Sequence, residues 1–364
     1  MKIGTFSVMQ QRDVTKSPAV VLQEALEQTV EAEKMGFDVA WYPEHHFNNY
    51  SLCPSPLVMA AHAAALTTKI RIGTAVLILP LYTPARIIEE IALVDILSKG
   101  RLELGVGSGY QKFEFDRYNV TMDNYKPVTH ELLDMIEAGL TQSHFSYNGQ
   151  HFQQLETSLS VRPIQKPMPP MWFATFDPNM MRRAARGGHG IFITGWMGNW
   201  KRLVGVRETI DDAYRQEGKD PRTAKVGLMR FCYVGESRAD VEKYVECARY
   251  QQRLGNSLKF RRESATSGYY IEEKPYDEEL PWDKMLANIP VGDVETVAER
   301  LTRDIRAIGA EQVSFIVQVG DLEQKKVLRS MELLAGKVMP LVRKALGPSF
   351  PYQSEGGQTA SAAE

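Results

Sequence analysis

Residues 70–110 read IRIGTAVLILPLYTPARIIEEIALVDILSKGRLELGVGSGY, and this segment sets the architecture of the chain. It begins with an apolar, β-rich run over 70–79. A helical pattern follows over 83–100, with apolar residues spaced about 3.6 positions apart. A second apolar run over 101–107 ends in a glycine-rich turn. Two buried strands joined by a helix predict neighbouring parallel strands in one sheet.

The same alternation of strand and helix repeats along the rest of the chain. The predicted strands cover residues 2–8, 37–43, 70–79, 101–107, 169–175, 189–195, 224–235 and 311–320. The predicted helices cover residues 18–36, 55–69, 83–100, 125–140, 178–188, 200–218, 238–252 and 322–345. Eight such units favour a closed (β/α)8 TIM barrel over an open doubly wound sheet. The turn after the first strand has no GxGxxG motif with a downstream acidic residue, which weakens the dinucleotide-binding alternative.

The predicted domain organisation is a single barrel over residues 1–346 with two insertions. Residues 142–167 have the pattern of a small hairpin. Residues 251–292 form a longer insertion, which is either a lid that orders over a ligand or a surface excursion. The small, polar residues 347–364 predict a flexible C-terminal tail.

Composition excludes several classes of partner. Lys and Arg total 43 and Asp and Glu total 45, for a formal charge of −2, so the charge gives no reason to expect nucleic acid or a membrane surface. No apolar stretch reaches the roughly 18 residues of a spanning helix. The N-terminus turns polar too early for a signal peptide. Three cysteines without CxxC spacing predict reduced thiols in a cytoplasmic protein.

In a TIM barrel the active site lies at the carboxyl ends of the strands, and this rule ranks the candidate residues. The second strand leads into Glu44, His45 and His46. Three roles for the histidine pair remain open, namely a metal site, a structural role and proton handling near neutral pH. Neither HExxH nor a third ligand at a telling spacing is present, so no metal is expected.

Two further strand ends carry groups suited to an anion. Gly107, Ser108 and Gly109 can bring backbone N–H groups and a hydroxyl close to a phosphate. The fifth strand leads through Thr175 into a helix, whose first N–H groups favour negative charge. Each signal alone is weak, and a barrel phosphate site more often uses strands seven and eight.

An apolar rim is expected to keep water away from this end of the barrel. Its candidate members are Trp41, Phe47, Leu79, Tyr110, Trp172, Phe176 and Trp196. Trp41 and Trp172 lie within strand patterns rather than after them, so plain core packing is the favoured interpretation for these two.

Taken together, these segments resemble the bacterial luciferase-like family of flavin-dependent monooxygenases. GFDVAWYPEHHF, residues 36–47, resembles the second-strand motif of that family. Residues 70–110 resemble its third strand, third helix and fourth strand in order and spacing. Residues 311–344 resemble its closing unit. The similarity is strong over residues 1–120 and looser over 165–235 and 290–346.

The resemblance implies a barrel that binds FMN and receives reduced flavin from a separate flavin reductase. The reduced FMN reacts with O2 to give a C4a-hydroperoxyflavin, which oxygenates a small or carrier-tethered organic substrate. His45 matches the catalytic histidine of the family, which is thought to steer proton transfer. His46 matches its neighbour, expected in packing or subunit contact. Ala75 and Val76 match a pair joined by a non-prolyl cis peptide against the flavin ring.

The chain departs from luciferase at the phosphate end of this site. Gly107 and Ser108 replace a cysteine and an arginine, so one phosphate charge is lost and room opens beside the flavin. The residues then expected to bind FMN are Ala75, Val76, Gly107, Ser108, Gly109, Tyr110, Thr175, Phe176, Asp177, Asn179 and Met180. Those expected on the substrate side are His46, Phe47, Leu79 and Trp196.

Two alternative functions stay open, and an assembly is expected. A deazaflavin-dependent dehydrogenase or reductase would transfer hydride without O2, although that branch usually lacks the His-His pair. A non-catalytic flavin-binding subunit is the other alternative, against which an intact His45 argues. The small-residue face of helix 55–69, with Glu89 and Glu90 nearby, predicts a homodimer.

Overall fold

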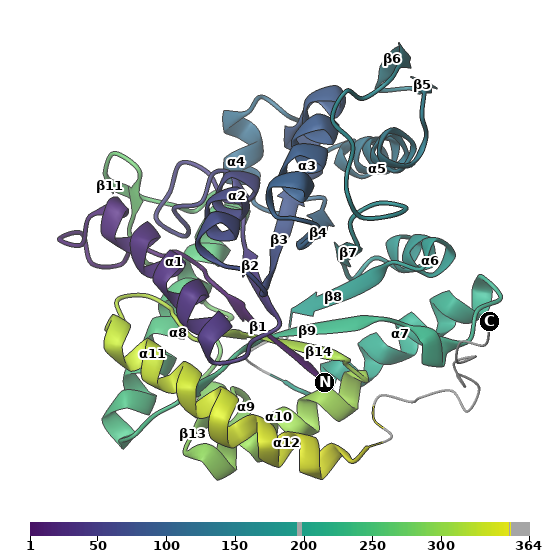
Figure 1. The fold of residues 1–364 in the computed structure, drawn as a ribbon. Helices are drawn as coiled ribbons and strands as arrows, with labels where there is room; N and C mark the ends of the chain where they lie inside the picture. Colours follow the sequence, from purple (N-terminus) through teal and green to yellow (C-terminus); the bar gives the residue numbers. More distant parts are fainter. Residues whose placement is uncertain (195–198, 349, 351–364) are drawn as a thin grey trace.

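A closed barrel of eight parallel strands forms the centre of the computed structural model, which describes residues 1–194, 199–348 and 350 (Figure 1). Around the barrel the order is β1-β14-β9-β8-β7-β4-β3-β2. The strand bounds are β1 (Lys2–Phe6), β2 (Val39–Tyr42), β3 (Arg71–Ile78), β4 (Leu102–Gly107), β7 (Met171–Ala174), β8 (Gly190–Thr194), β9 (Val226–Phe231) and β14 (Gln312–Ile316). The predicted (β/α)8 TIM barrel is confirmed.

Helices surround this ring of strands (Figure 1). They are α1 (Pro18–Lys34), α2 (Pro56–Leu66), α3 (Pro84–Leu97), α4 (Lys112–Arg117), α5 (Tyr125–Thr141), α6 (Pro178–Gly187), α7 (Arg202–Gln216), α8 (Arg238–Phe260), α9 (Trp282–Asn288), α10 (Val294–Ile308), α11 (Gln324–Leu333) and α12 (Met339–Leu346). Short 3₁₀ helices are η1 (Leu79–Leu81) and η2 (Pro221–Thr223). A single π-helical turn, η3 (Leu334–Val338), joins α11 to α12, so the closing helix is nearly continuous, as predicted.

The seventh helix of the outer ring differs from the sequence interpretation. The expected helix over 238–252 exists as the start of α8, but α8 continues to Phe260 and packs against α4. The place between α7 and α12 is taken by α10, which the sequence interpretation missed. Val297, Leu301 and Ile305 of α10 are fully buried there. Helix α8 is therefore free to cross toward the rim of the barrel.

Aromatic side chains fill the barrel interior. The ring centroids of Trp41 and Trp172 lie 6.2 Å apart in an edge-on arrangement, and Trp41 lies 5.0 Å from Phe192. A Cβ on Gly73 would stand 2.2 Å from the Trp41 ring, and one on Gly190 would stand 2.2 Å from the Trp172 ring. The glycines thus make room for the indoles, and the core role expected for both tryptophans is confirmed.

Smaller sheets lie outside the barrel. In the first insertion β5 (Phe145–Asn148) pairs antiparallel with β6 (Gln153–Thr157), and this hairpin projects away from the ring of strands (Figure 1). The second insertion contains the hairpin of β11 (Ala265–Ser267) and β12 (Tyr270–Ile271). After α9, β13 (Val291–Gly292) pairs with β10 (Tyr233–Val234). Most of the expected tail, residue 349 and residues 351–364, lies outside the described residues.

The described residues include no helix that is both long and apolar enough to cross a membrane. Cys53, Cys232 and Cys247 are all buried free thiols.

Candidate active site

The two histidines after β2 are each held by a buried carboxylate. His45 Nδ1 lies 2.9 Å from Glu114 Oε1, and His46 Nε2 lies 2.8 Å from Glu44 Oε1. The side chain of His45 keeps 11% of its surface exposed, whereas that of His46 keeps 5%. The two rings therefore have different environments. Only the His45 ring has a nitrogen left for chemistry at the barrel mouth.

Glu44 links the loop after β2 to the end of β3, and His46 is bonded to Glu44. The Nδ1 of His46 lies 3.0 Å from the Tyr118 hydroxyl, so both ring nitrogens have protein partners. Glu44 also accepts hydrogen bonds from the Ile78 backbone N–H at 2.9 Å and the Tyr82 hydroxyl at 2.8 Å. Burial and then the Glu44 charge raise the pKa of Tyr82. The substrate role expected for His46 is not supported, because its ring is saturated with structural hydrogen bonds.

Two tyrosines enclose the His45 ring. The Tyr50 ring meets it edge-on with centroids 4.7 Å apart, and the Tyr110 ring does so at 6.2 Å. Tyr110 donates to the Tyr50 hydroxyl at 3.2 Å, and Gln251 Nε2 of α8 donates to that same hydroxyl at 3.3 Å. Burial raises the pKa of Tyr50. Both rings limit how far His45 can turn and leave its edge toward the mouth.

Two uncharged, half-buried residues interrupt the buried run of β3 in its carboxyl-terminal half. Ala75 and Val76 are joined by a non-prolyl cis peptide bond, as the resemblance implied. Both are half-buried within a strand whose neighbouring residues are buried, and the register with β4 shifts across them. A Cβ on Gly107 would stand 2.9 Å from Val76 Cγ2. The glycine therefore lets Val76 lie against β4, and the space expected to open at Gly107 is taken by the Val76 side chain.

The anion side of the mouth combines β4 and the start of α6. Ser108 is half-buried, and Gly109 has φ +76. Thr175 Oγ1 accepts from the Asp177 N–H at 2.9 Å, and Asp177 Oδ1 caps α6 by accepting from the Asn179 N–H at 2.9 Å. Ser108 and Thr175 follow adjacent strands, β4 and β7. They therefore lie at the carboxyl edge of the barrel where a phosphate was expected.

Asp177 brings a negative charge to the same place, and Lys126 compensates it. Lys126 Nζ lies 2.9 Å from Asp177 Oδ2. Burial alone would raise the pKa of Asp177, but the Lys126 hydrogen bond and the Asn179 N–H hold it below its ordinary value. The paired carboxylate leaves this helix start close to neutral, so the backbone N–H groups of α6 remain compatible with a phosphate.

Three predicted residues have side chains engaged elsewhere, and a fourth is not described. Met180 is 6% exposed and packs in the core, so it offers no side chain to a cofactor. Leu79 is fully buried in the core and does not reach the substrate side. Asn179 is exposed, and its Oδ1 accepts from Arg182 at 2.6 Å. Trp196 lies outside the described residues.

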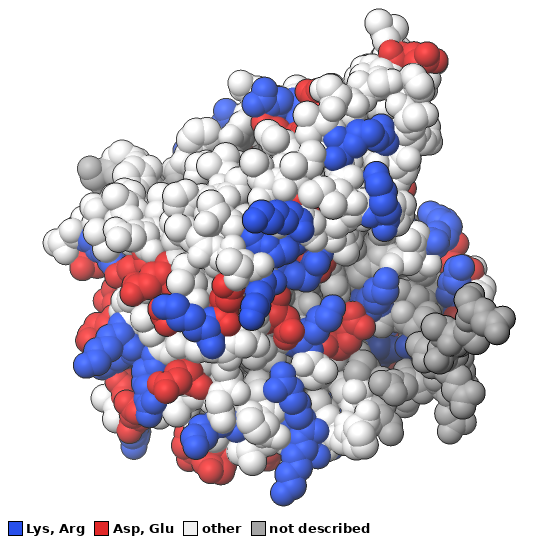
Figure 2. Space-filling view, in the orientation of Figure 1, with Lys and Arg blue, Asp and Glu red and all other residues white. Residues whose placement is uncertain are grey.

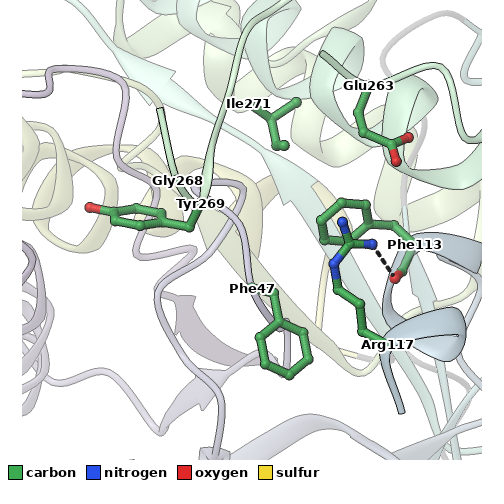
Figure 3. Close-up of a pocket in the computed structure, with 7 residues that line it drawn as sticks. All are labelled: Phe47, Phe113, Arg117, Glu263, Gly268, Tyr269 and Ile271. Carbon is green, nitrogen blue, oxygen red and sulfur yellow. Dashed lines mark hydrogen bonds between the residues drawn. The ribbon is translucent and has the colours of Figure 1, made fainter. Parts of the chain in front are cut away.

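Phe47 and Phe176 behave as rim residues. Phe176 is 41% exposed beneath the Arg202 guanidinium, 5.5 Å from its ring centroid. Phe47 is 52% exposed and lines a cavity of about 490 Å³. The other lining residues are Phe113, Arg117, Glu263, Gly268, Tyr269 and Ile271 (Figure 3). This cavity lies between the loop that carries His45 and His46, helix α4 and the β11–β12 hairpin. It is separate from the part of the mouth formed by β3 and β4.

The second insertion packs on the loop that carries the histidines. Asn49 Nδ2 donates to the Tyr250 hydroxyl at 2.8 Å and to the Ile271 carbonyl at 3.2 Å, while its Oδ1 accepts from the Ile271 N–H at 2.8 Å. A satellite core lies beneath this contact. It contains Phe113, Tyr250, Leu254, Leu258 and Ile271, with Tyr50 packed against it. The insertion thus supports both the loop that carries the histidines and helix α4.

The residues at the mouth fit a flavin. The half-buried peptide of Ala75 and Val76 offers an apolar face, His45 follows the adjacent strand, and the Ser108 hydroxyl is available to a phosphate. In the part of the chain that is described, no three His, Cys, Asp or Glu side chains are grouped to hold a metal ion.

Glu114 is the residue that the sequence interpretation missed. It is fully buried, and its Oε1 accepts from both His45 Nδ1 and the His46 backbone N–H, the latter at 2.8 Å. The available signal was a glutamate between two phenylalanines, in KFEF directly after the glycine-rich turn. A carboxylate on an apolar helical face is unusual unless it has a partner, and that pattern points to a buried site.

The fold and the site together define a barrel enzyme with its chemistry at the carboxyl ends of the strands. A profile of the family described as luciferase-like monooxygenase matches residues 1–312, so the chain belongs to the luciferase-like monooxygenase family.

Named relatives narrow the type of chemistry. The chain is 44% identical over 349 residues to the uncharacterised protein y4vJ of Sinorhizobium fredii, covering 96% of this chain and 99% of that one. It is 27% identical to the oxygenase component of a flavin-dependent trigonelline monooxygenase of Acinetobacter baylyi, covering 93% and 95%. The crystal structure of monooxygenase RslO1 from Streptomyces bottropensis superposes with a TM-score of 0.81 at 22% identity, covering 93% of this chain and 99% of that one. The Acinetobacter relative supports a flavin-dependent monooxygenase, whereas the RslO1 structure supports the fold alone.

Proposed function

We propose that this protein is an FMN-dependent monooxygenase that uses reduced FMN and O2 to oxygenate an organic substrate. The observation that carries the proposal is the placement of His45. A half-buried imidazole, fixed at one nitrogen, follows β2, and β2 pairs with β3, which carries the uncharged peptide of Ala75 and Val76. An uncharged apolar surface suits a flavin ring, and an imidazole with one nitrogen left unengaged suits proton transfer next to it.

When bound, reduced FMN supplies two electrons, so that one atom of O2 enters the substrate and the other leaves as water. The protein orients the reactants and controls the proton. His45 holds or gives a proton at Nε2, because its Nδ1 is engaged by Glu114. Tyr50 and Tyr110 cover the ring and limit access of water.

The phosphate of FMN is assigned to the side of the mouth formed by Ser108, Gly109 and residues 175–179. Ser108 contributes a hydroxyl, Gly109 permits close approach of the backbone, and the first turn of α6 contributes the Met180 N–H, since its Asn179 and Met181 N–H groups are bonded to Asp177. Phe176, exposed on the same segment, is placed against the cofactor as an apolar wall.

A separate reductase is proposed as the source of reduced FMN. One relative is named as the oxygenase component of its enzyme, which supports a division of reduction and oxygenation between two proteins. The buried free thiols agree with a reducing cytoplasmic location, which we also propose.

The test combines cofactor binding with oxygen consumption. The purified protein should bind FMN, and photoreduced FMN with a suitable acceptor substrate should give turnover-linked O2 uptake. Replacing His45 with Ala should lower product formation by about 10²-fold or more, the usual range for a proton-transfer group, while FMN binding is retained. Unchanged product yield in that variant would remove His45 from the reaction.

The main rival predicts a different outcome. A deazaflavin-dependent dehydrogenase would transfer hydride to or from its substrate without consuming O2. Substrate turnover with a deazaflavin and no O2 uptake would favour it, and absence of any FMN binding in either redox state would end the present proposal.

A homodimer is also proposed, through a face different from the expected one. Ala60, Ala63 and Ala64 of α2 are buried within their own chain, so the small-residue face is not outward. The outward faces of α2 and α3, which pack side by side, expose Val58, Leu66, Leu93, Ile96 and Leu97. Figure 2 shows a largely uncharged area over these two helices. A contiguous apolar face of this kind is typical of a subunit interface.

A further inference from the structure

The carboxyl group of Glu114 is arranged asymmetrically. Oε1 accepts two hydrogen bonds, from the His45 ring at 2.9 Å and from the His46 backbone N–H at 2.8 Å. Oε2 is buried and has no hydrogen-bond partner within the described residues. A fully buried carboxyl group with an idle oxygen is costly, so its retention calls for a function beyond packing.

The geometry fixes the His45 tautomer. Oε1 acts as an acceptor toward the His46 N–H, and a carboxylate oxygen has only acceptor capacity toward the imidazole as well. The hydrogen of the neutral His45 ring must then be on Nδ1. The only protein hydrogen bond of this ring among the described residues is the one to Glu114. Nε2 is therefore the nitrogen left for the mouth of the barrel.

We propose that Glu114 is the positioning residue of the site: it selects the Nδ1–H tautomer of His45 and directs the Nε2 lone pair to the barrel mouth. The inference deepens the proposed function, since it takes His45 to be the proton-handling group. A carboxylate that orients an imidazole in this way acts through the histidine and does not touch the reacting atoms.

The helix that carries Glu114 is itself held by the second insertion. Phe113 packs in the satellite core with Leu254, Leu258 and Ile271 of that insertion. Asp116 forms an ion pair with Arg261 at the end of α8. Helix α4 is thus clamped one residue before and two residues after Glu114, and this clamp sets the position of the carboxyl group.

Because Oε2 accepts no hydrogen bond from the described residues, Glu114→Gln should retain most of the function of Glu114. A Gln carbonyl in place of Oε1 can accept both hydrogen bonds, and its NH2 group then occupies the unpartnered position. Gln111 Oε1, also buried without a partner in the described residues, lies one helical turn away as an acceptor. Leucine has a similar volume but accepts no hydrogen bond.

The experiment is ¹⁵N NMR of histidine side chains in the full-length protein, with the His45 signals identified through His45→Ala. In the wild type and in Glu114→Gln, His45 should be mainly the Nδ1–H tautomer. In Glu114→Leu this preference should disappear. Glu137→Gln is the matched control, because Glu137 faces His189, at 3.5 Å, instead of His45. An unchanged tautomer in Glu114→Leu, or a dominant Nε2–H form in the wild type, overturns the proposal.

Turnover supplies an independent comparison. Glu114→Leu should lower kcat by about 10²-fold and Glu114→Gln by no more than about tenfold, with FMN binding kept in both. In a His45→Ala background Glu114→Leu should cause no further loss, because Glu114 acts through that ring. A further loss there would reveal a role independent of His45. The NMR result needs no turnover, so failure of the oxygenase proposal would leave it readable.

Discussion

Gly109 joins two constraints at a single residue. Its φ of +76 is unfavourable for a residue with a Cβ, and a Cβ there would stand 2.7 Å from Ile78 Cγ2 and 2.7 Å from Phe115 Cε2. Gly109→Ala should therefore lower the free energy of unfolding by about 2–5 kcal/mol, the sum of backbone strain and overpacking. Urea denaturation measures the effect.

Gly36 separates the two causes. It has a φ of +83, but no atom of the described residues lies within 4 Å of the point where its Cβ would stand, so Gly36→Ala should cost only about 1 kcal/mol. Equal losses in the two variants would show that contact with Ile78 and Phe115 adds nothing at Gly109.

Some individual site residues could be predicted from the sequence, and others could not. The resemblance pointed to His45 and to the peptide of Ala75 and Val76, because these sit in short motifs with fixed spacing. Glu114 escaped because its partners lie 69 and 68 positions away, and only the closed barrel brings them together. The burial of the Met180 side chain was not predictable, because a helix start leaves backbone N–H groups available while the side chain can still turn into the core.

Among the elements, strands were easier to predict than the helix that follows β9. Barrel strands are short buried runs, so their apolar pattern is direct. Both α8 and α10 have helical periodicity, and no local sequence pattern indicates which of them lies in the outer ring. Long-range packing decides, since α8 has apolar partners on α4 and α10 has partners on α7 and α12.

The second insertion is fastened to the barrel rim by Arg12. This residue forms ion pairs with Glu246 of α8, with Glu273 at 2.9 Å and with Asp321 at 3.3 Å. Its guanidinium also lies 4.8 Å from the centroid of the Tyr250 ring. Arg12→Met should lower the free energy of unfolding by about 1 kcal/mol near pH 7, because these pairs are partly exposed and screened by solvent.

This loss should depend on pH. Burial would raise the pKa of Glu246, but the Arg12 hydrogen bond and Lys243 hold it below its ordinary 4.5. A carboxylate with a lowered folded-state pKa contributes stability above its unfolded-state value, and the contribution disappears as pH falls through the folded-state value. The gap between wild type and Arg12→Met should therefore be full above about pH 5 and shrink below pH 4.5.

Urea unfolding at several pH values measures this gap. Arg238→Met is the control, because among the described residues Arg238 pairs only with Glu242 on the surface of α8 and its side chain is 91% exposed. That change should stay within about 0.5 kcal/mol at every pH. A gap for Arg12→Met that grows on acidification would contradict the assigned network.

For the whole molecule, the apolar face of α2 and α3 predicts the state of assembly. Leu66→Glu combined with Leu97→Glu should convert a dimer to a monomer, since burying each leucine contributes about 1.5–3 kcal/mol and a buried unpaired carboxylate adds a penalty. Sedimentation velocity at micromolar concentration measures the change.

Leu155→Glu serves as the comparison, because Leu155 is 86% exposed on the β5–β6 hairpin, away from the two helices. It should leave the sedimentation coefficient unchanged. A wild-type monomer at these concentrations would rule out the dimer.

The two indole rings inside the barrel limit the routes by which ligands can reach its interior. Trp41 and Trp172, with Phe192, occupy the lumen beneath the mouth, and the glycines opposite them leave no gap. In the described part of the chain, this packing thus closes the barrel beneath the mouth. A ligand that binds at the mouth therefore has to enter and leave from the carboxyl ends of the strands.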